Sequence, residues 1–168
     1  MYLRANAGII KASKSRRIYW VKSKSKVRET RYTSGASTSV DNYDCRILPT
    51  PPFPFKTNIN IASVQLEKDS VSFFPDKIVI IQDGCVAAVS YDNLKCEYEE
   101  IKFIEDKAPS DTKILEMTWR YVNKDGSRDR RFKNNYQCPI CAYGKLTLTA
   151  GKALNLVLYF SNRKPFEV

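Results

Sequence analysis

Residue types that commonly carry catalytic chemistry are scarce in this chain. Its 168 residues include no histidine, which removes Ser-His-Asp and Cys-His nucleophile pairs, imidazole acid–base catalysis and zinc sites that need imidazole. Cys138 and Cys141 form a single CxxC motif, which supplies only half of a tetrahedral zinc site. Because Cys45, Cys85 and Cys96 are scattered, we interpret the CxxC cysteines as small buried apolar residues. We predict no metal site, no cofactor and no catalytic residue.

A short stretch rich in carboxylates is a second candidate for metal chemistry. Glu97, Glu99 and Glu100 lie in a strand-like segment, near Glu105 and Asp106 at its end. Carboxylate oxygens suit divalent cations, but acidic side chains on an exposed strand face ordinarily meet water. We therefore predict a solvated face here.

A densely charged stretch, TWRYVNKDGSRDRRFKNN, covers residues 118–135 and begins like a β-strand. Its charged part, residues 123–135, is longer than an ordinary hairpin connection, which raises the expectation of function. We favour an internally braced loop, because Asp129 lies between two arginines and Phe132 can anchor the loop. An anion or partner site is the alternative, formed by Lys124, Arg128, Arg130, Arg131 and Lys133.

Positive charge is concentrated at the N-terminus. The net charge is +10, and residues 1–32 hold ten basic residues against one acid. Cations interleaved with tyrosine and tryptophan have the parts that bind phosphates and bases. One interpretation is that this arm binds nucleic acid. The same cations would also suit binding to an anionic membrane surface. The third interpretation is a terminus that is merely solvated. The candidate residues are Lys14, Arg16, Arg17, Lys22, Lys24, Lys26 and Arg28.

Three features bear on cellular location. The chain has no apolar run of about 18 residues, so we predict no membrane span. The N-terminal MYLRANAGIIKASKSRR is too polar for a secretory signal. Five cysteines at irregular spacing fit reduced thiols better than a disulfide framework. Together these features predict a cytoplasmic protein.

Strand signals recur at short intervals along most of the chain. Asp83-Gly84 separates two of these signals and predicts a hairpin. The spacing and the lack of a convincing long helix favour antiparallel β-structure. The candidate strands are residues 18–21, 59–67, 70–74, 77–82, 85–90, 95–105, 114–122, 141–149 and 154–162.

Two candidate strands carry a more detailed expectation. In residues 95–105 the apolar positions change phase between Tyr98 and Ile101, which suggests a β-bulge. In residues 114–122 the apolar residues share one face, which we predict to point into the core. That second set comprises Leu115, Met117, Trp119 and Tyr121.

Prolines separate the basic segment from the candidate strands. The segment LPTPPFPF, residues 48–55, is excluded from a central strand and is expected to run as polyproline II along the surface. It is either a packed connector or a ligand for an aromatic groove. We therefore divide the chain into a basic arm with an early strand (1–40), a proline-rich connector (41–58) and a β-domain (59–168).

The predicted fold class is all-β with at most a minor helix. An antiparallel barrel or sandwich of about seven strands accounts for the pattern. The strand order resembles a pleckstrin-homology-like barrel with a truncated C-terminal helix, because only RKPFEV follows the last candidate strand.

Several stretches together resemble a bacterial family of uncharacterised β-rich domains. They are FFPDKIVI (73–80), AVSYDNL (88–94), TWRYVNKDG (118–126), DRRFKNN (129–135) and PICAYG (139–144). The similarity covers residues 31–162 or so and therefore most of the chain. It implies a β-rich accessory module rather than an enzyme, and it names no ligand.

We predict a non-catalytic binding or regulatory module that acts through protein–protein interaction. The alternative is a nucleic-acid-binding accessory protein that uses the basic arm. The sequence makes no prediction of oligomeric state.

Overall fold

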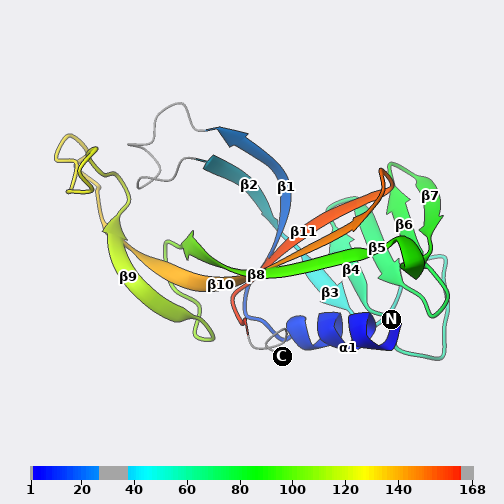
Figure 1. The fold of residues 1–168 in the computed structure, drawn as a ribbon. Helices are drawn as coiled ribbons and strands as arrows, with labels where there is room; N and C mark the ends of the chain where they lie inside the picture. Colours follow the sequence, from blue (N-terminus) through cyan, green and yellow to red (C-terminus); the bar gives the residue numbers. More distant parts are fainter. Residues whose placement is uncertain (1, 27–37, 164–168) are drawn as a thin grey trace.

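The protein folds mainly as antiparallel β-structure. The computed structural model describes residues 2–26 and 38–163, where eleven strands accompany one α-helix and one 3-10 helix (Figure 1). The strands form two antiparallel sheets that do not close into a barrel. The all-β prediction is confirmed in a sandwich-like form, and the pleckstrin-homology-like topology stays a prediction.

The larger sheet combines strands from both ends of the chain. Its strand order is β2-β1-β11-β10-β8, and β9 pairs with β10 outside this path. The connection between β8 and β9 and the loop after β9 extend from the half of the molecule remote from α1 (Figure 1). The strands are β1 (Ile18–Lys26), β2 (Thr38–Asp44), β8 (Lys95–Ile104), β9 (Lys113–Trp119), β10 (Gln137–Ala150) and β11 (Leu154–Phe160).

The smaller sheet is a meander of neighbouring strands. Asp83 and Gly84 both have positive φ, 49° and 77°, as the predicted tight hairpin between β6 and β7 requires. A 3-10 turn, η2 (Tyr91–Asn93), then leads into the larger sheet. The strands are β3 (Arg46–Leu48), β4 (Ser63–Leu66), β5 (Asp69–Phe73), β6 (Ile78–Gln82) and β7 (Cys85–Val89).

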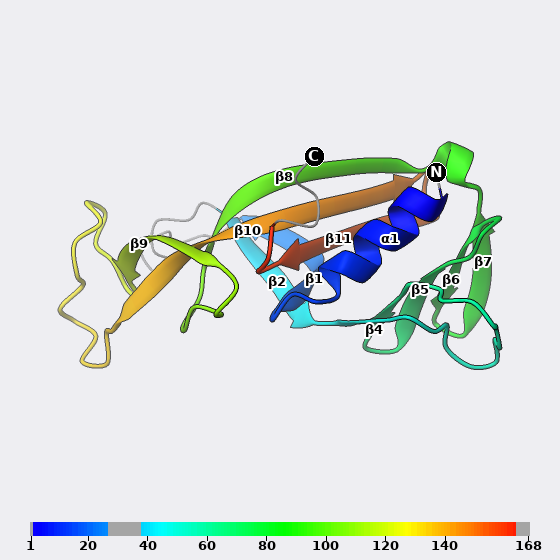
Figure 2. The ribbon, with the colours of Figure 1, turned by 90° about the horizontal axis from the view of Figure 1, so that it is seen from below.

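The main core lies between the two sheets and the helix α1 (Tyr2–Ala12) (Figure 2). Leu146 and Leu158 come from the larger sheet, and Phe73 comes from the smaller one; all three are fully buried. From α1, Ile9 and Ala12 enter this core. The N-terminal segment is therefore part of the fold, which the sequence interpretation did not anticipate because it predicted no helix here.

A second, aromatic core covers the opposite face of the larger sheet. Tyr19, Tyr143 and Tyr159 are buried there, with Phe103 packed against them. Because successive residues of a strand point to opposite faces, β10 sends Leu146 into the main core and Tyr143 into the aromatic core. One sheet thus separates two cores.

This arrangement corrects the prediction of a bulge in residues 95–105. The pairing of β8 with β10 runs from Lys95 to Ile104 without a shift in register. Tyr98 pairs with Leu146, whose side chain enters the main core, whereas Ile101 pairs with Tyr143 of the aromatic core. The apolar residues change phase because Tyr98 lies on the face of the main core and Ile101 on the face of the aromatic core, along a strand whose pairing is regular.

The prediction that β9 faces the core is wrong. Leu115 and Met117 are 42% and 51% exposed, and Trp119 and Tyr121 are only half-buried. The strand extends beyond both cores and pairs only with β10 among the described residues. The alternating pattern predicted which residues share a face of the strand. It could not predict that neither core covers that face.

We expect Gly144→Ala to destabilise the fold. A Cβ at Gly144 would lie 2.7 Å from the hydroxyl oxygen of Tyr98 and 2.9 Å from its ring. The hydroxyl donates a hydrogen bond to the carbonyl of Arg163, 3.0 Å away, which holds the ring in place. Overpacking of this kind costs about 1–3 kcal/mol, measurable by urea unfolding. In a Tyr98→Ala background the cost should largely disappear; an equal cost in both backgrounds would contradict this explanation.

Candidate functional site

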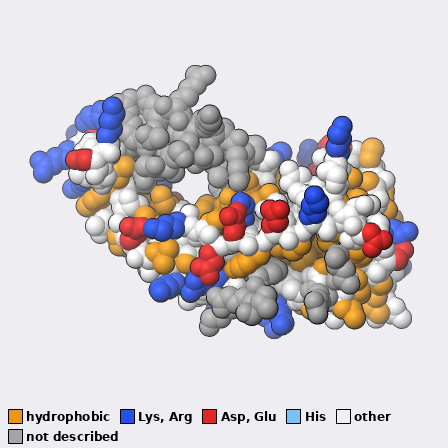
Figure 3. Space-filling view, viewed as in Figure 1, with side chains coloured by type: hydrophobic (Ala, Val, Ile, Leu, Met, Phe, Trp, Pro, Cys, Tyr) orange, Lys and Arg blue, Asp and Glu red, His pale blue; other side chains and the backbone are white. Residues whose placement is uncertain are grey.

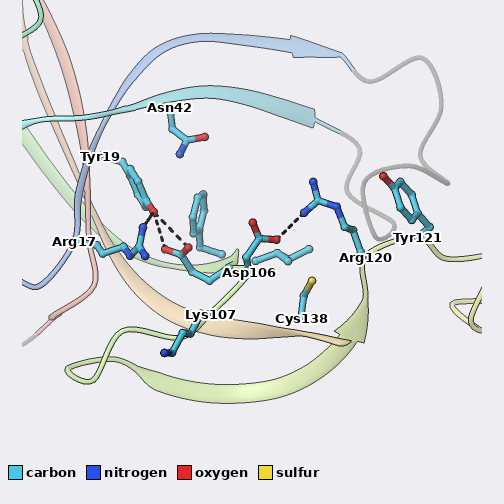
Figure 4. A pocket seen from close by; sticks show the side chains of 11 residues that line it. Arg17, Tyr19, Asn42, Asp106, Lys107, Arg120, Tyr121 and Cys138 are labelled. Carbon is cyan, nitrogen blue, oxygen red and sulfur yellow. Dashed lines mark hydrogen bonds and ion pairs between the residues drawn. The ribbon is translucent and has the colours of Figure 1, made fainter. Parts of the chain in front are cut away.

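An open cleft of about 560 Å³ lies between the β1–β2 pair and the ends of β8, β9 and β10 (Figure 4). Tyr19 and Phe103 extend the aromatic core to its surface. Charged and polar residues line it from strands and connections that are far apart in the sequence. Among them are Arg17, Asn42, Glu105, Lys107 and Arg120.

A buried carboxylate forms the floor of this cleft. Glu105 is 7% exposed and accepts a hydrogen bond from the hydroxyl of Tyr19 at 3.0 Å. The hydroxyl of Tyr143 donates a second, short hydrogen bond to it. Arg17 Nη1 lies above and donates to the Tyr19 hydroxyl at 3.1 Å. Burial and the Glu105 charge raise the pKa of Tyr19 to about 12 and that of Tyr143 further, so both phenols keep their protons at neutral pH.

An ion pair lies beside the floor. Arg120 Nη1 is 2.6 Å from Asp106 Oδ1, and the Tyr136 hydroxyl donates to the same oxygen at 2.8 Å. Figure 4 shows this pair across from Tyr19. Both carboxylates at the cleft therefore already have partners within the protein.

The rest of the predicted acidic cluster lies along the exposed part of β8. Glu99 pairs with Lys145, and Glu100 pairs with Arg163 at 2.7 Å. Among the described residues no three metal-ligating side chains converge on one point. Two of these acids are therefore engaged in ion pairs across the sheet.

The predicted basic-arm residues are distributed over two segments. Three precede β1, and there the backbone N–H of Arg16 donates to Asp111 at 2.8 Å. Within β1 the Lys22 ammonium lies 5.6 Å from the ring centre of Trp20 and 5.7 Å from that of Tyr43. Of the remaining residues, Lys14 is exposed and Arg17 lines the cleft. Lys24 and Lys26 belong to β1, and Arg28 lies outside the described residues.

The loop 123–135 is braced from within, as the favoured interpretation predicted. Asp129 is 1% exposed and forms an ion pair with Arg131. Asn135 is buried and bonds the backbone N–H and carbonyl of Tyr121 and the carbonyl of Asp129. Phe132 stacks on Tyr121 with ring centres 4.1 Å apart. These contacts account for the buried part of the loop without a ligand.

The same loop presents cations at its surface. Arg128 lies over the ring of Trp119, 4.8 Å from its centre. Lys124, Arg130 and Lys133 are exposed and have no ion-pair partner among the described residues. Figure 3 shows basic side chains gathered at this end of the molecule. The loop and the β1–β2 pair lie on the same half of the molecule (Figure 1).

The CxxC cysteines lie within β10 and are buried as free thiols. Residues three apart in a strand point to opposite faces, so Cys138 and Cys141 cannot jointly ligate one metal ion. Burial raises the pKa of both thiols. Their role as small buried residues agrees with the sequence interpretation.

The sequence did not reveal the cleft. Tyr19 and Tyr143 lie 86 and 38 residues from Glu105 along the chain, so no local motif contains them. A single acid at the end of an alternating strand, in a chain rich in tyrosine, was the only available signal.

Comparison with protein families, curated proteins and solved structures finds no match to this chain. The resemblance to uncharacterised bacterial domains stays a prediction. No helix within residues 2–26 and 38–163 is long and apolar enough to cross a membrane.

We expect Tyr19 to make stability depend on alkaline pH. Its folded pKa of about 12 exceeds the value of about 10 for an unfolded tyrosine. Its contribution is therefore complete below about pH 10 and is lost as the pH rises towards 12. Between about pH 9.5 and 11.5 the wild type should lose about 2 kcal/mol more than Tyr19→Phe. Urea unfolding at both pH values measures this difference, and equal losses would contradict the assignment.

We expect Asn135→Ala to loosen the loop 123–135. Removal of the amide leaves the buried N–H and carbonyl of Tyr121 and the carbonyl of Asp129 without this partner. The expected loss of unfolding free energy is about 2–3 kcal/mol. Asn134→Ala is the matched control, because Asn134 is exposed and should change stability by less than about 0.5 kcal/mol. Similar effects of the two substitutions would show that the loop is not braced in this way.

Proposed function

We propose that this protein is a non-catalytic binding module that holds an extended, acidic segment of a protein partner in the cleft. The observation that carries the proposal is the open cleft itself, about 560 Å³ in volume and bordered by two separate parts of one sheet. A concave site with a few convergent polar groups is the usual form of a binding site.

The unused hydrogen-bonding groups of the cleft favour an acidic partner. Glu105 and Asp106 are bonded to tyrosine hydroxyls and Arg120. The guanidinium of Arg17 donates one hydrogen bond, through Nη1 to the hydroxyl of Tyr19, and its other N–H groups have no partner among the described residues. Lys107 is exposed and has no partner there either. Carboxylates of a bound segment would pair with these two cations.

The aromatic floor favours binding rather than chemistry. Tyr19 and Phe103 offer apolar surface to the side chains of a segment. The raised pKa of Tyr19 and Tyr143 makes both phenols weaker proton donors and leaves almost no phenolate at neutral pH to act as a base. These tyrosines bind Glu105, so the network serves to fix the shape of the cleft.

A second candidate function is nucleic-acid binding by the loop 123–135. The observation that favours it is the set of exposed cations Lys124, Arg130 and Lys133, next to Arg128 stacked on Trp119. Such a site would bind phosphates with a steep dependence on salt.

We expect neutralisation of the cleft cations to weaken partner binding. The probe is a phage library of random dodecapeptides selected on the immobilised full chain. The selected peptides should contain Asp or Glu, and the variant Arg17→Gln/Lys107→Gln should bind them about tenfold more weakly, a loss of about 1.4 kcal/mol. Fluorescence anisotropy with the free peptides measures the affinities.

The matched control is Lys124→Gln/Lys133→Gln, which removes the same charge from the loop 123–135. It should change peptide affinity by less than about twofold, or about 0.4 kcal/mol. Equal weakening by both variants would place the site elsewhere. Binding of oligothymidylate that falls steeply with salt and is lost in the loop variant, without peptide binding, would support the second candidate instead.

A further inference from the structure

The cleft is bordered by two sheet edges that have no partner strand among the described residues. The larger sheet begins with β2 and ends with β8, and residues of both strands line the cleft. An unpaired edge offers a row of backbone N–H and C=O groups to an added strand. The direction of these groups can be derived from the hydrogen bonds of the neighbouring strands.

On β2 the backbone of Asn42 points away from β1. The N–H of Cys45 donates to the carbonyl of Ile18 in β1 at 3.1 Å. In an antiparallel strand, alternate residues direct both backbone groups to the same neighbour. Cys45 and Tyr43 therefore face β1, and Asn42, which lines the cleft, faces outward.

On β8 the backbone of Ile104 points away from β10. The N–H of Glu105 donates to the carbonyl of Pro139 in β10 at 3.1 Å. By the same alternation Ile104 directs its N–H and carbonyl outward, and Ile104 also lines the cleft. Outward-facing backbone groups of Asn42 and Ile104 thus border a single cleft from its two sides.

The directions of the strands leave room for one more strand. From β2 to β8 each neighbouring pair is antiparallel, so the two edge strands run in the same direction within the sheet. One strand antiparallel to both would continue the alternation and remove both edges, as closure does in antiparallel barrels. The rise per strand residue, multiplied by the spacing between strands and by the spacing between packed sheets, gives a volume of about 160 Å³ for each residue of a strand. The cleft of about 560 Å³ therefore accommodates about three to four residues of such a strand.

We propose that the partner segment enters the cleft as an added β-strand, antiparallel to β2 and β8, and closes this half of the larger sheet. The proposal rests on the proposed function, because it specifies how the acidic segment binds. Main-chain hydrogen bonds to Asn42 and Ile104 supply affinity, as in other cases of strand addition. Apolar side chains of the segment contact Tyr19 and Phe103, and its acidic side chains pair with Arg17 or Lys107.

The test removes one outward N–H without disturbing the sheet. Asn42→Pro lacks the donor that faces the cleft, while proline is compatible with an edge strand because that N–H does not pair with β1. It should lower the affinity for the selected acidic dodecapeptides about tenfold. Asn42→Ala, the matched control, should lower that affinity less than about twofold. Urea unfolding of the two variants confirms equal stability.

The peptides supply an independent measurement. A strand between two edges uses both of its sides, so N-methylation of either alternate set of peptide amides should weaken binding about tenfold. Hydrogen exchange at the Ile104 amide should slow on peptide binding. Full affinity for Asn42→Pro and for both N-methylated peptides, with the dependence on Arg17 and Lys107 retained, would overturn strand addition and leave the proposed function standing. Sensitivity to only one methylated set would overturn pairing with both edges, and the absence of any selected peptide would overturn both proposals.

Discussion

The backbone ladder between β8 and β10 holds the two halves of the protein together, because its two faces belong to different cores. Tyr98 and Leu146 lie together on the face of the main core, and Ile101 and Tyr143 lie on the other. A slip of one residue in this register would exchange the two faces. Burial on both sides of β10 therefore makes the register strict, and the position of the cleft follows from it.

Polar contacts of buried side chains stabilise the half of the molecule that the main core does not reach. The phenols of Tyr19 and Tyr143 both bind Glu105, which joins β1, β8 and β10 at one point. Farther out, Asn135 and Asp129 replace an apolar core within the loop 123–135. Buried polar groups that are fully bonded stabilise a single conformation, so this half is ordered without a second sheet.

Local patterns in the sequence predicted local structure well. The Asp83-Gly84 hairpin and the pairing of aspartate with arginine in the loop 123–135 both involve residues close in the chain. The exposure of β9 and the convergence of Arg17 with Glu105 depend on tertiary packing, which alternation alone does not reveal. The first turn of helix α1 contains no acidic residue. The sequence therefore lacks one of the usual signals that mark the start of a helix, and the helix was not predicted.

The pairing of β1 with β11 has a consequence for folding during synthesis. Ile18 pairs with Phe160, so the first strand stays without this neighbour until nearly the whole domain has left the ribosome. The meander β3 to β7 needs only hairpins between adjacent strands and can form earlier. Because distant pairings are slow to form, we expect the larger sheet to assemble last.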